Sequence, residues 1–164
     1  NGSGKTVLFK CICGLLQINE GSILVDKKEI GAIIEEPGFL KQYSGKQNLR
    51  LLASMSGKEN IDIEKVLKAV GLEHAGRKKV GKYSMGMRQR LGIAQAIMEN
   101  PDILILDEPM NGLDKHGVED MRKLLVQLKK EGTTILVASH NPLDIEILCD
   151  EVYEIDAGAI TRVH

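Results

Sequence analysis

Short apolar runs alternate with amphipathic segments along this 164-residue chain, and this alternation restricts the fold more than any other feature. The stretch 103–106 is wholly apolar, 114–130 carries apolar side chains at helical spacing, and 133–138 is strongly apolar again. A strand, a helix and a second strand in this order favour two parallel strands joined by a crossover helix. The sequence therefore predicts an α/β fold with a mostly parallel sheet.

The remaining elements are expected on the same grounds. Further strands are predicted at 22–26, 30–34 and 152–155, and further helices at 5–16, 47–55, 63–70, 85–99 and 142–148. Asp62 and Ser84 are the expected N-caps of the helices at 63–70 and 85–99. We expect a single domain, 1–164, with an α/β core at 1–40 and 101–164 and a helical insert at 41–100.

Composition narrows the classes of function. The net charge is −1 and aromatic residues make up only 3% of the chain, so neither a basic surface nor stacking rings favour a nucleic acid as partner. The three cysteines are too few and too scattered for a disulfide framework or a zinc cluster. No apolar run approaches the roughly 18 residues that a membrane span needs. These features fit a reduced, cytoplasmic protein.

The chain opens on a glycine-rich string, Asn1-Gly2-Ser3-Gly4-Lys5-Thr6. This is the second part of the phosphate-binding pattern GxxxxGK[ST], so we expect the domain to be truncated at its N-terminus. Such a turn directs backbone N–H groups into a concavity that suits phosphate, with the Lys5 ammonium on the β- and γ-phosphates and the Thr6 hydroxyl on Mg²⁺. The alternative is an ordinary N-cap turn, with Ser3 as the cap and Lys5 in solvent.

The apolar strand at 103–106 ends in two carboxylates, Asp107 and Glu108. Phosphoryl transfer needs a residue that holds the metal and one that orients the attacking water. Because side chains alternate along a strand, Asp107 and Glu108 are expected to point to opposite sides, the first suited to Mg²⁺ and the second to water. The alternative is a buried strand that ends in a solvated acidic turn.

Three further strings complete a recognisable order: Tyr83-Ser84-Met85-Gly86-Met87-Arg88-Gln89-Arg90-Leu91, Asn111-Gly112-Leu113-Asp114 and Ser139-His140. Together with the phosphate loop and the acidic strand end, they resemble the ATP-binding cassette (ABC) transporter ATPase family over essentially the whole chain. The resemblance implies a P-loop NTPase fold, with a RecA-like parallel-sheet core and an inserted α-helical subdomain. It also implies ATP hydrolysis with Mg²⁺ in a head-to-tail dimer that sandwiches two ATP molecules.

The resemblance also implies roles for individual positions. Asn1 to Thr6 correspond to the Walker A loop and Asp107 to the end of Walker B, with Glu108 as the catalytic glutamate and His140 as the switch histidine. The signature, which contacts ATP bound to the opposite subunit, corresponds to Ser84, Met85, Gly86 and Met87. The loop that crosses the dimer interface corresponds to Gly112, Leu113 and Asp114.

Two departures from the family pattern point to a subfamily. The signature reads SMGM rather than SGGQ, and the coupling-loop glutamine is replaced by Glu35, whose carboxylate still offers an oxygen to Mg²⁺ or water. The strings IGAIIEEPGF and YSMGMRQRLGIA resemble the bacterial ATPases of bacitracin-resistance and lantibiotic-immunity exporters. This implies export of a peptide antibiotic or a similar amphiphile through a separate transmembrane subunit, with the ATPase on the inner face of the cell membrane.

Other functions remain as alternatives at this point. A soluble ABC ATPase of the translation-factor type would carry a second cassette in the same chain. A DNA-repair type would need a long coiled coil between the two Walker motifs, and the 102 residues from Lys5 to Asp107 leave no room for one. A binding module without catalysis is disfavoured, because both carboxylates that hydrolysis requires are present.

Overall fold

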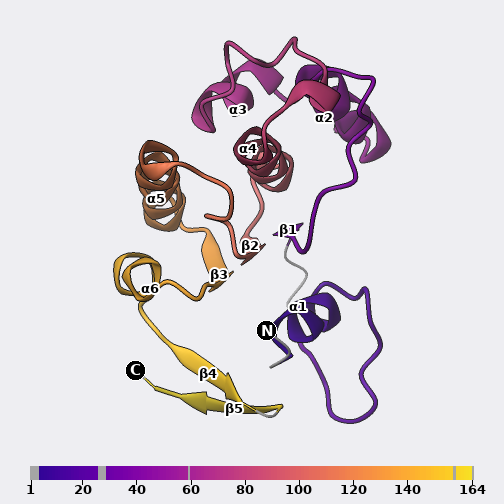
Figure 1. The fold of residues 1–164 in the computed structure, drawn as a ribbon. Coiled ribbons are helices and arrows are strands. Elements are labelled where there is room, and N and C mark those ends of the chain that lie inside the picture. Colours follow the sequence, from indigo (N-terminus) through magenta and orange to yellow (C-terminus); the bar gives the residue numbers. More distant parts are fainter. Residues whose placement is uncertain (1–3, 26–28, 59, 157, 164) are drawn as a thin grey trace.

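A computed structural model describes residues 4–25, 29–58, 60–156 and 158–163 of the chain (Figure 1). In chain order its elements are α1 (Lys5–Ile12), β1 (Ile30–Ile33), α2 (Gly45–Met55), α3 (Ile63–Ala69), the 3₁₀ turn η1 (Val80–Lys82), α4 (Met85–Ile97), β2 (Ile103–Asp107), α5 (Lys115–Lys130), β3 (Thr134–Ala138), α6 (Pro142–Leu148), β4 (Tyr153–Asp156) and β5 (Ala159–Arg162).

The central sheet has three parallel strands in the order β1-β2-β3, which confirms the predicted α/β class. Strand β2 lies in the middle, with Leu106 opposite Ile33 of β1 and Val137 of β3. Strands β4 and β5 form a separate antiparallel hairpin beyond α6 (Figure 1). Because β1, β2 and β3 are parallel, their carboxyl ends lie at the same edge of the central sheet.

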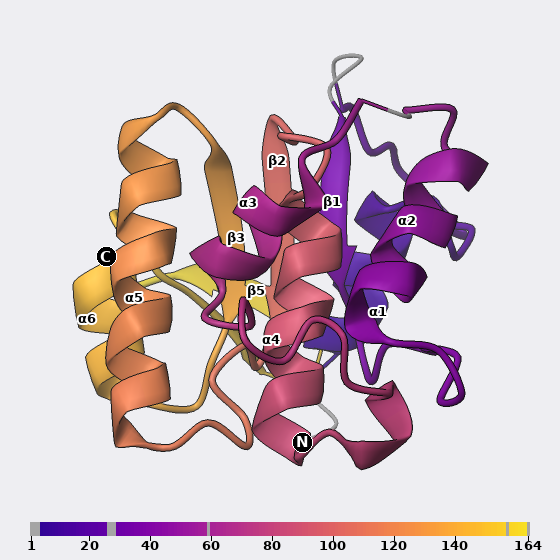
Figure 2. The same cartoon turned by 90° about the horizontal axis from the view of Figure 1, so that it is seen from above.

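Helices cover both faces of this sheet. Figure 2 shows α5, α4 and α2 side by side across one face, and α1 packs against the other. Alternate residues of β2 face the two layers: Leu104 and Leu106 join the cluster under α4 and α5, whereas Ile105 packs with Phe9 of α1. Asp107 is two residues beyond Ile105, so the strand alternation places it on the α1 side.

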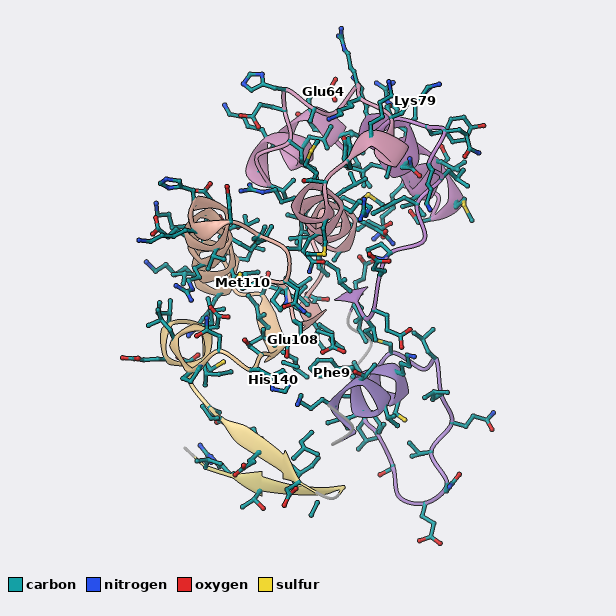
Figure 3. All side chains as sticks on the ribbon, viewed as in Figure 1. Phe9, Glu64, Lys79, Glu108, Met110 and His140 are labelled. Atoms are coloured by element: carbon teal, nitrogen blue, oxygen red, sulfur yellow. The ribbon has the colours of Figure 1, made fainter. Side chains whose placement is uncertain are left out.

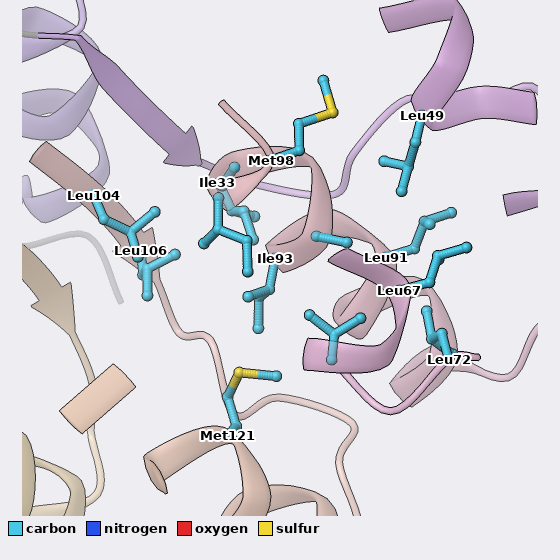
Figure 4. Packing of buried hydrophobic residues seen from close by; sticks show 14 of the residues in the cluster. Ile33, Leu49, Leu67, Leu72, Leu91, Ile93, Met98, Leu104, Leu106 and Met121 are labelled. Atoms are coloured by element: carbon cyan, nitrogen blue, oxygen red, sulfur yellow. The ribbon is translucent and has the colours of Figure 1, made fainter. Parts of the chain in front are cut away.

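The main hydrophobic core lies between the sheet and the helices α2 to α5 (Figure 4). Its fully buried members include Leu49, Leu91, Ile93, Leu104, Leu106, Met121 and Leu125. Helix α4 contributes to it on two sides, against α2 and α3 and against β1. One continuous core thus joins the helical segment to the sheet, and the division at residues 41 and 100 stays a prediction about domain boundaries.

Side-chain caps fix where several helices begin. Asp62 accepts a hydrogen bond from the Lys65 N–H at 3.0 Å, and Ser84 accepts one from the Met87 N–H at 3.2 Å, so both predicted N-caps are confirmed. Asp114 caps α5 in the same way. Each cap satisfies an N–H group of the first turn that has no partner within the helix.

Two predictions about elements were wrong, and one strand was missed. Residues 22–25 form no strand; the Leu24 side chain is 93% exposed, and no strand in the described part of the chain pairs with this segment. The helix at 5–16 ends at Ile12, because Gly14 has a left-handed φ of 70° and the Leu15 N–H bonds back to the Lys10 carbonyl at 2.8 Å. The second strand of the hairpin, β5, was not predicted. None of the helices in the described residues is long and apolar enough to cross a membrane.

Candidate functional site

A cavity of about 500 Å³ opens where α1 begins and where the three parallel strands end. Five segments line it, at the start of α1, after β1, at the start of α4, after β2 and after β3. The lining residues are Gly4, Lys5, Thr6, Val7, Glu35, Glu36, Met85, Gln89, Asp107, Glu108, Asn111 and His140. The carboxyl edge of a parallel sheet is where α/β proteins bind ligands, and residues predicted from five separate motifs meet there.

The N-terminal end of α1 forms one wall of the cavity. Gly4, with a left-handed φ of 100°, is the N-cap and has no side chain that could cap the N–H groups of the first turn. The first turn also contains no acidic residue. These N–H groups and the positive end of the helix dipole suit an anion such as phosphate, and Lys5 adds a positive charge beside them. The predicted positions Asn1, Gly2 and Ser3 lie outside the described residues.

Thr6 and Asp107 meet across the sheet edge. The Thr6 hydroxyl donates a hydrogen bond to Asp107 Oδ2 at 2.6 Å, although 101 residues separate the two in sequence. Hydroxyl and carboxylate oxygens are the hard ligands that Mg²⁺ takes in nucleotide sites. In the described part of the chain, no three His, Cys, Asp or Glu side chains are grouped to hold a metal by themselves. This pair therefore fits a Mg²⁺ whose remaining ligands are phosphate oxygens and water.

Glu108 and His140 lie together at the ends of β2 and β3 (Figure 3). His140 Nε2 is 3.3 Å from Glu108 Oε1. That oxygen is buried, and it has no hydrogen-bond partner among the described residues. The Glu108 backbone has a left-handed φ of 49°, and its N–H donates to the Ala138 carbonyl at 2.9 Å. The Glu108 side chain as a whole is 25% exposed and lines the cavity, so its carboxylate can accept a hydrogen bond from a water molecule there.

The signature residues pack against the predicted dimer loop of the same chain. Met85 is 56% exposed and lines the cavity. A Cβ on Gly86 would lie 2.6 Å from the Gly112 carbonyl oxygen, and a Cβ on Gly112 would lie 2.5 Å from Met85 Cε. Gly86 therefore requires glycine, because a backbone oxygen occupies the space of a side chain. Gly112 favours glycine mainly because its φ is 75°, since the flexible Met85 side chain could move. The two motifs form one continuous surface at the rim of the cavity.

Glu35 lines the same cavity but already has a partner. Its Oε1 accepts a hydrogen bond from Lys10 Nζ at 2.7 Å, and its side chain is 63% exposed. Like Glu108, it has a left-handed backbone, with φ of 66°. The prediction that Glu35 contacts the metal stays a prediction. The structure adds that the Glu35 carboxylate forms an ion pair with Lys10 of α1.

Gln89 is a residue of the site that the sequence did not single out. Its Nε2 donates to the Pro109 carbonyl at 3.1 Å and lies 3.4 Å from the Glu108 carbonyl. It therefore links α4, which begins within the signature, to the backbone of Glu108 and Pro109 after β2. The available signal was its position: Gln89 lies five residues after Ser84, a little more than one helical turn, at the start of α4.

Known proteins resemble the chain in sequence and in fold. A family model described as "ABC transporter" matches residues 1–111. The bacitracin transport ATP-binding protein BcrA of Bacillus licheniformis is 43% identical, over 98% of this chain and 56% of that protein. The lantibiotic transport ATP-binding protein SrtF of Streptococcus pyogenes is 38% identical, over 98% of this chain and 73% of that protein.

Among solved structures, one titled "Structure of ATP binding subunit of ABC transporter" superposes with a TM-score of 0.85 at 24% identity, over 99% of this chain and 75% of that one. This likeness confirms the predicted fold. The chain spans between 56% and 78% of the length of the curated relatives that it matches. The predicted resemblance to ATPases of bacitracin and lantibiotic transport is confirmed at the level of sequence similarity.

Proposed function

Because the chain belongs to the ABC transporter family, whose ATP-binding members are ATPases that power transport, we propose that it binds and hydrolyses ATP for an exporter of peptide antibiotics or similar amphiphiles. The observation that carries this proposal is the meeting of Thr6, Asp107, Glu108 and His140 at one cavity beside the start of α1.

The α1 wall of the cavity binds the phosphates of ATP in this proposal. The N–H groups at the start of α1 and the Lys5 ammonium would bind negatively charged phosphate oxygens. Asn1, Gly2 and Ser3 are further predicted phosphate-binding residues. Thr6 and Asp107 would hold Mg²⁺, which neutralises phosphate charge when it is bound. Glu35 is a further predicted ligand of the metal or its water.

Glu108 and His140 act on the reacting groups. The Glu108 carboxylate, which lines the cavity, accepts a hydrogen bond from a water molecule and orients it toward the γ-phosphorus. A new bond forms between the water oxygen and phosphorus while the bond to the β–γ bridging oxygen breaks. The water proton passes to the Glu108 carboxylate, and ADP leaves with the electron pair of the broken bond. His140, 3.3 Å from Glu108, donates a hydrogen bond to the transferred phosphate.

The signature and dimer-loop surface takes part in assembly in this proposal. Ser84 to Met87 contact ATP held by a second copy of the chain, and Gly112, Leu113 and Asp114 cross the interface. Their support is the packing of Gly86 on Gly112 and the exposed Met85 at the cavity rim. A head-to-tail homodimer then encloses two ATP molecules and drives a separate transmembrane permease from the cytoplasmic face of the membrane.

The choice of an exporter of antibiotics rests on two relatives, whose names describe bacitracin transport and lantibiotic transport. A soluble ATPase of the translation-factor type is not favoured, because no observation in the structure or among these relatives points to it.

The decisive test is the Glu108→Gln variant of the full-length protein. We expect ATP affinity to stay within about twofold, and steady-state hydrolysis to fall by about 10²- to 10⁴-fold, because the amide cannot act as a base. Glu154→Gln, which changes an exposed carboxylate on β4, is the matched control and should hydrolyse ATP at the wild-type rate. Equal rates for Glu108→Gln and wild type would exclude Glu108 as the catalytic residue.

A further inference from the structure

Asp144 is a buried carboxylate that the proposed reaction does not use. It lies on α6 and is only 1% exposed. Its Oδ1 accepts a hydrogen bond from Arg122 Nε of α5 at 2.8 Å and is also paired with Nη2 of the same guanidinium. Its Oδ2 accepts a hydrogen bond from the Ser139 hydroxyl at 3.0 Å. Both oxygens are thus used, as burial of a charged group requires.

The Ser139 hydroxyl connects this buried pair to the segment that carries His140. The same oxygen that donates to Asp144 accepts a hydrogen bond from the Asn141 N–H at 3.1 Å. Asn141 in turn caps α6 by accepting from the Leu143 N–H at 3.0 Å. The hydroxyl of Ser139, the residue before His140, is therefore hydrogen-bonded to Asn141, the residue after it. Asp144 fixes the direction in which this hydroxyl donates.

Holding the helices together does not require this arrangement. A buried ion pair contributes little stability compared with apolar side chains of similar size. Helices α5 and α6 are also joined farther along by Lys129, whose Nζ lies 2.7 Å from Asp150 Oδ1 and 3.3 Å from the Leu148 carbonyl. What distinguishes the Asp144 pair is its place beside the His140 segment, at the catalytic edge of the sheet.

We propose that Asp144, held by Arg122, is a positioning residue that acts through the Ser139 hydroxyl to fix the direction of His140 toward Glu108. The His140 side chain itself is 57% exposed, so its direction depends on the backbone that carries it. This inference rests on the proposed ATPase function. It adds a series of hydrogen bonds that runs from Arg122 on α5 through Asp144 and Ser139 to the segment that carries His140.

The main test uses Ser139→Ala in the full-length protein, because this change removes the link and leaves the Arg122–Asp144 pair intact. We expect kcat for ATP hydrolysis to fall by about 10- to 100-fold, the size of loss that a misplaced catalytic group causes, with KM for ATP nearly unchanged. The melting temperature should fall by only a few degrees, because the buried Asp144 Oδ2 loses one hydrogen-bond donor while the pair with Arg122 stays. Ser139→Thr, which keeps a hydroxyl, should restore kcat. Asp144→Asn, whose amide N–H₂ group faces Ser139 when its oxygen stays on Arg122, should lower kcat in the same way.

The matched control is Asp150→Asn. It removes the other ion pair between α5 and the end of α6, which has no bond to the His140 segment, and should leave kcat within about twofold of wild type. An unchanged kcat in Ser139→Ala overturns the positioning role, as does a parallel loss in Asp150→Asn. If wild type hydrolyses ATP and Glu108→Gln does not, such a result leaves the proposed function standing; an inactive wild type overturns both.

Discussion

The two faces of the central sheet are packed in different ways. Under α2, α4 and α5 a continuous apolar core extends from Leu49 to Met121 (Figure 4). Under α1 the buried apolar residues are Phe9, Ile105 and Ala138, flanked by partly buried neighbours. The α1 face adds a polar contact, the hydrogen bond from Thr6 to Asp107. The difference teaches that the helix proposed to bind phosphate is held less by buried area and more by groups that also serve the ligand.

The largest expected effect comes from the larger core. Leu104→Ala removes a fully buried side chain between β2 and the helices, and should lower the free energy of unfolding by about 3 kcal/mol, since little can collapse into the cavity. Urea denaturation measures this loss. Thr161→Ala on the exposed strand β5 is the control and should change the unfolding midpoint little.

Phe9→Ala tests the smaller cluster. We expect a loss of about 2 kcal/mol in the free energy of unfolding, below the usual range for a buried phenylalanine, because Phe9 has few fully buried neighbours. Saturating ATP with Mg²⁺ should return about 2 kcal/mol if the variant still binds it, because a ligand that binds only the folded state stabilises it. A loss as large as that of Leu104→Ala would show that the two faces contribute equally.

Thr6→Val gives the smallest expected effect and concerns the polar contact alone. The isosteric change removes the hydrogen bond to Asp107 and should lower the free energy of unfolding by about 1 kcal/mol in the absence of ligand. Thr6→Ser keeps the hydroxyl, and thermal denaturation without ligand should give it the melting temperature of wild type. If Thr6→Val and Thr6→Ser have the same melting temperature, this hydrogen bond does not stabilise the packing of α1 on the sheet.

The sequence predicted most of what local physics controls. Helix α6 begins and ends where expected, because Pro142 suits the first turn of a helix. The wholly apolar run at 103–106 is short, which favoured a buried strand over a helix, and it forms most of β2. In the structure, the alternation of side chains along β2 places Asp107 on the α1 side, where it meets Thr6.

The sequence could not predict what depends on distant partners. The segment 22–25 has the apolar residues of a strand, but a strand also needs a neighbour to bond with. Asp144 reads as an ordinary acidic residue in the first turn of a helix, and only packing shows that it is buried on Arg122 and Ser139. Gln89 likewise gains its role from two backbone carbonyls that lie about 20 residues along the chain.

The left-handed backbones of Glu108 and Glu35 have a consequence for how such a protein changes over generations. Glycine adopts this conformation freely, whereas other residues lose about 1 kcal/mol or more in it. Selection for thermostability alone would therefore favour glycine at both positions and so remove two carboxylates from the cavity. If the protein is evolved in the laboratory for heat resistance alone, without selection for ATP hydrolysis, glycine should replace Glu108 and Glu35 early. Catalytic activity would then be lost while the fold persists.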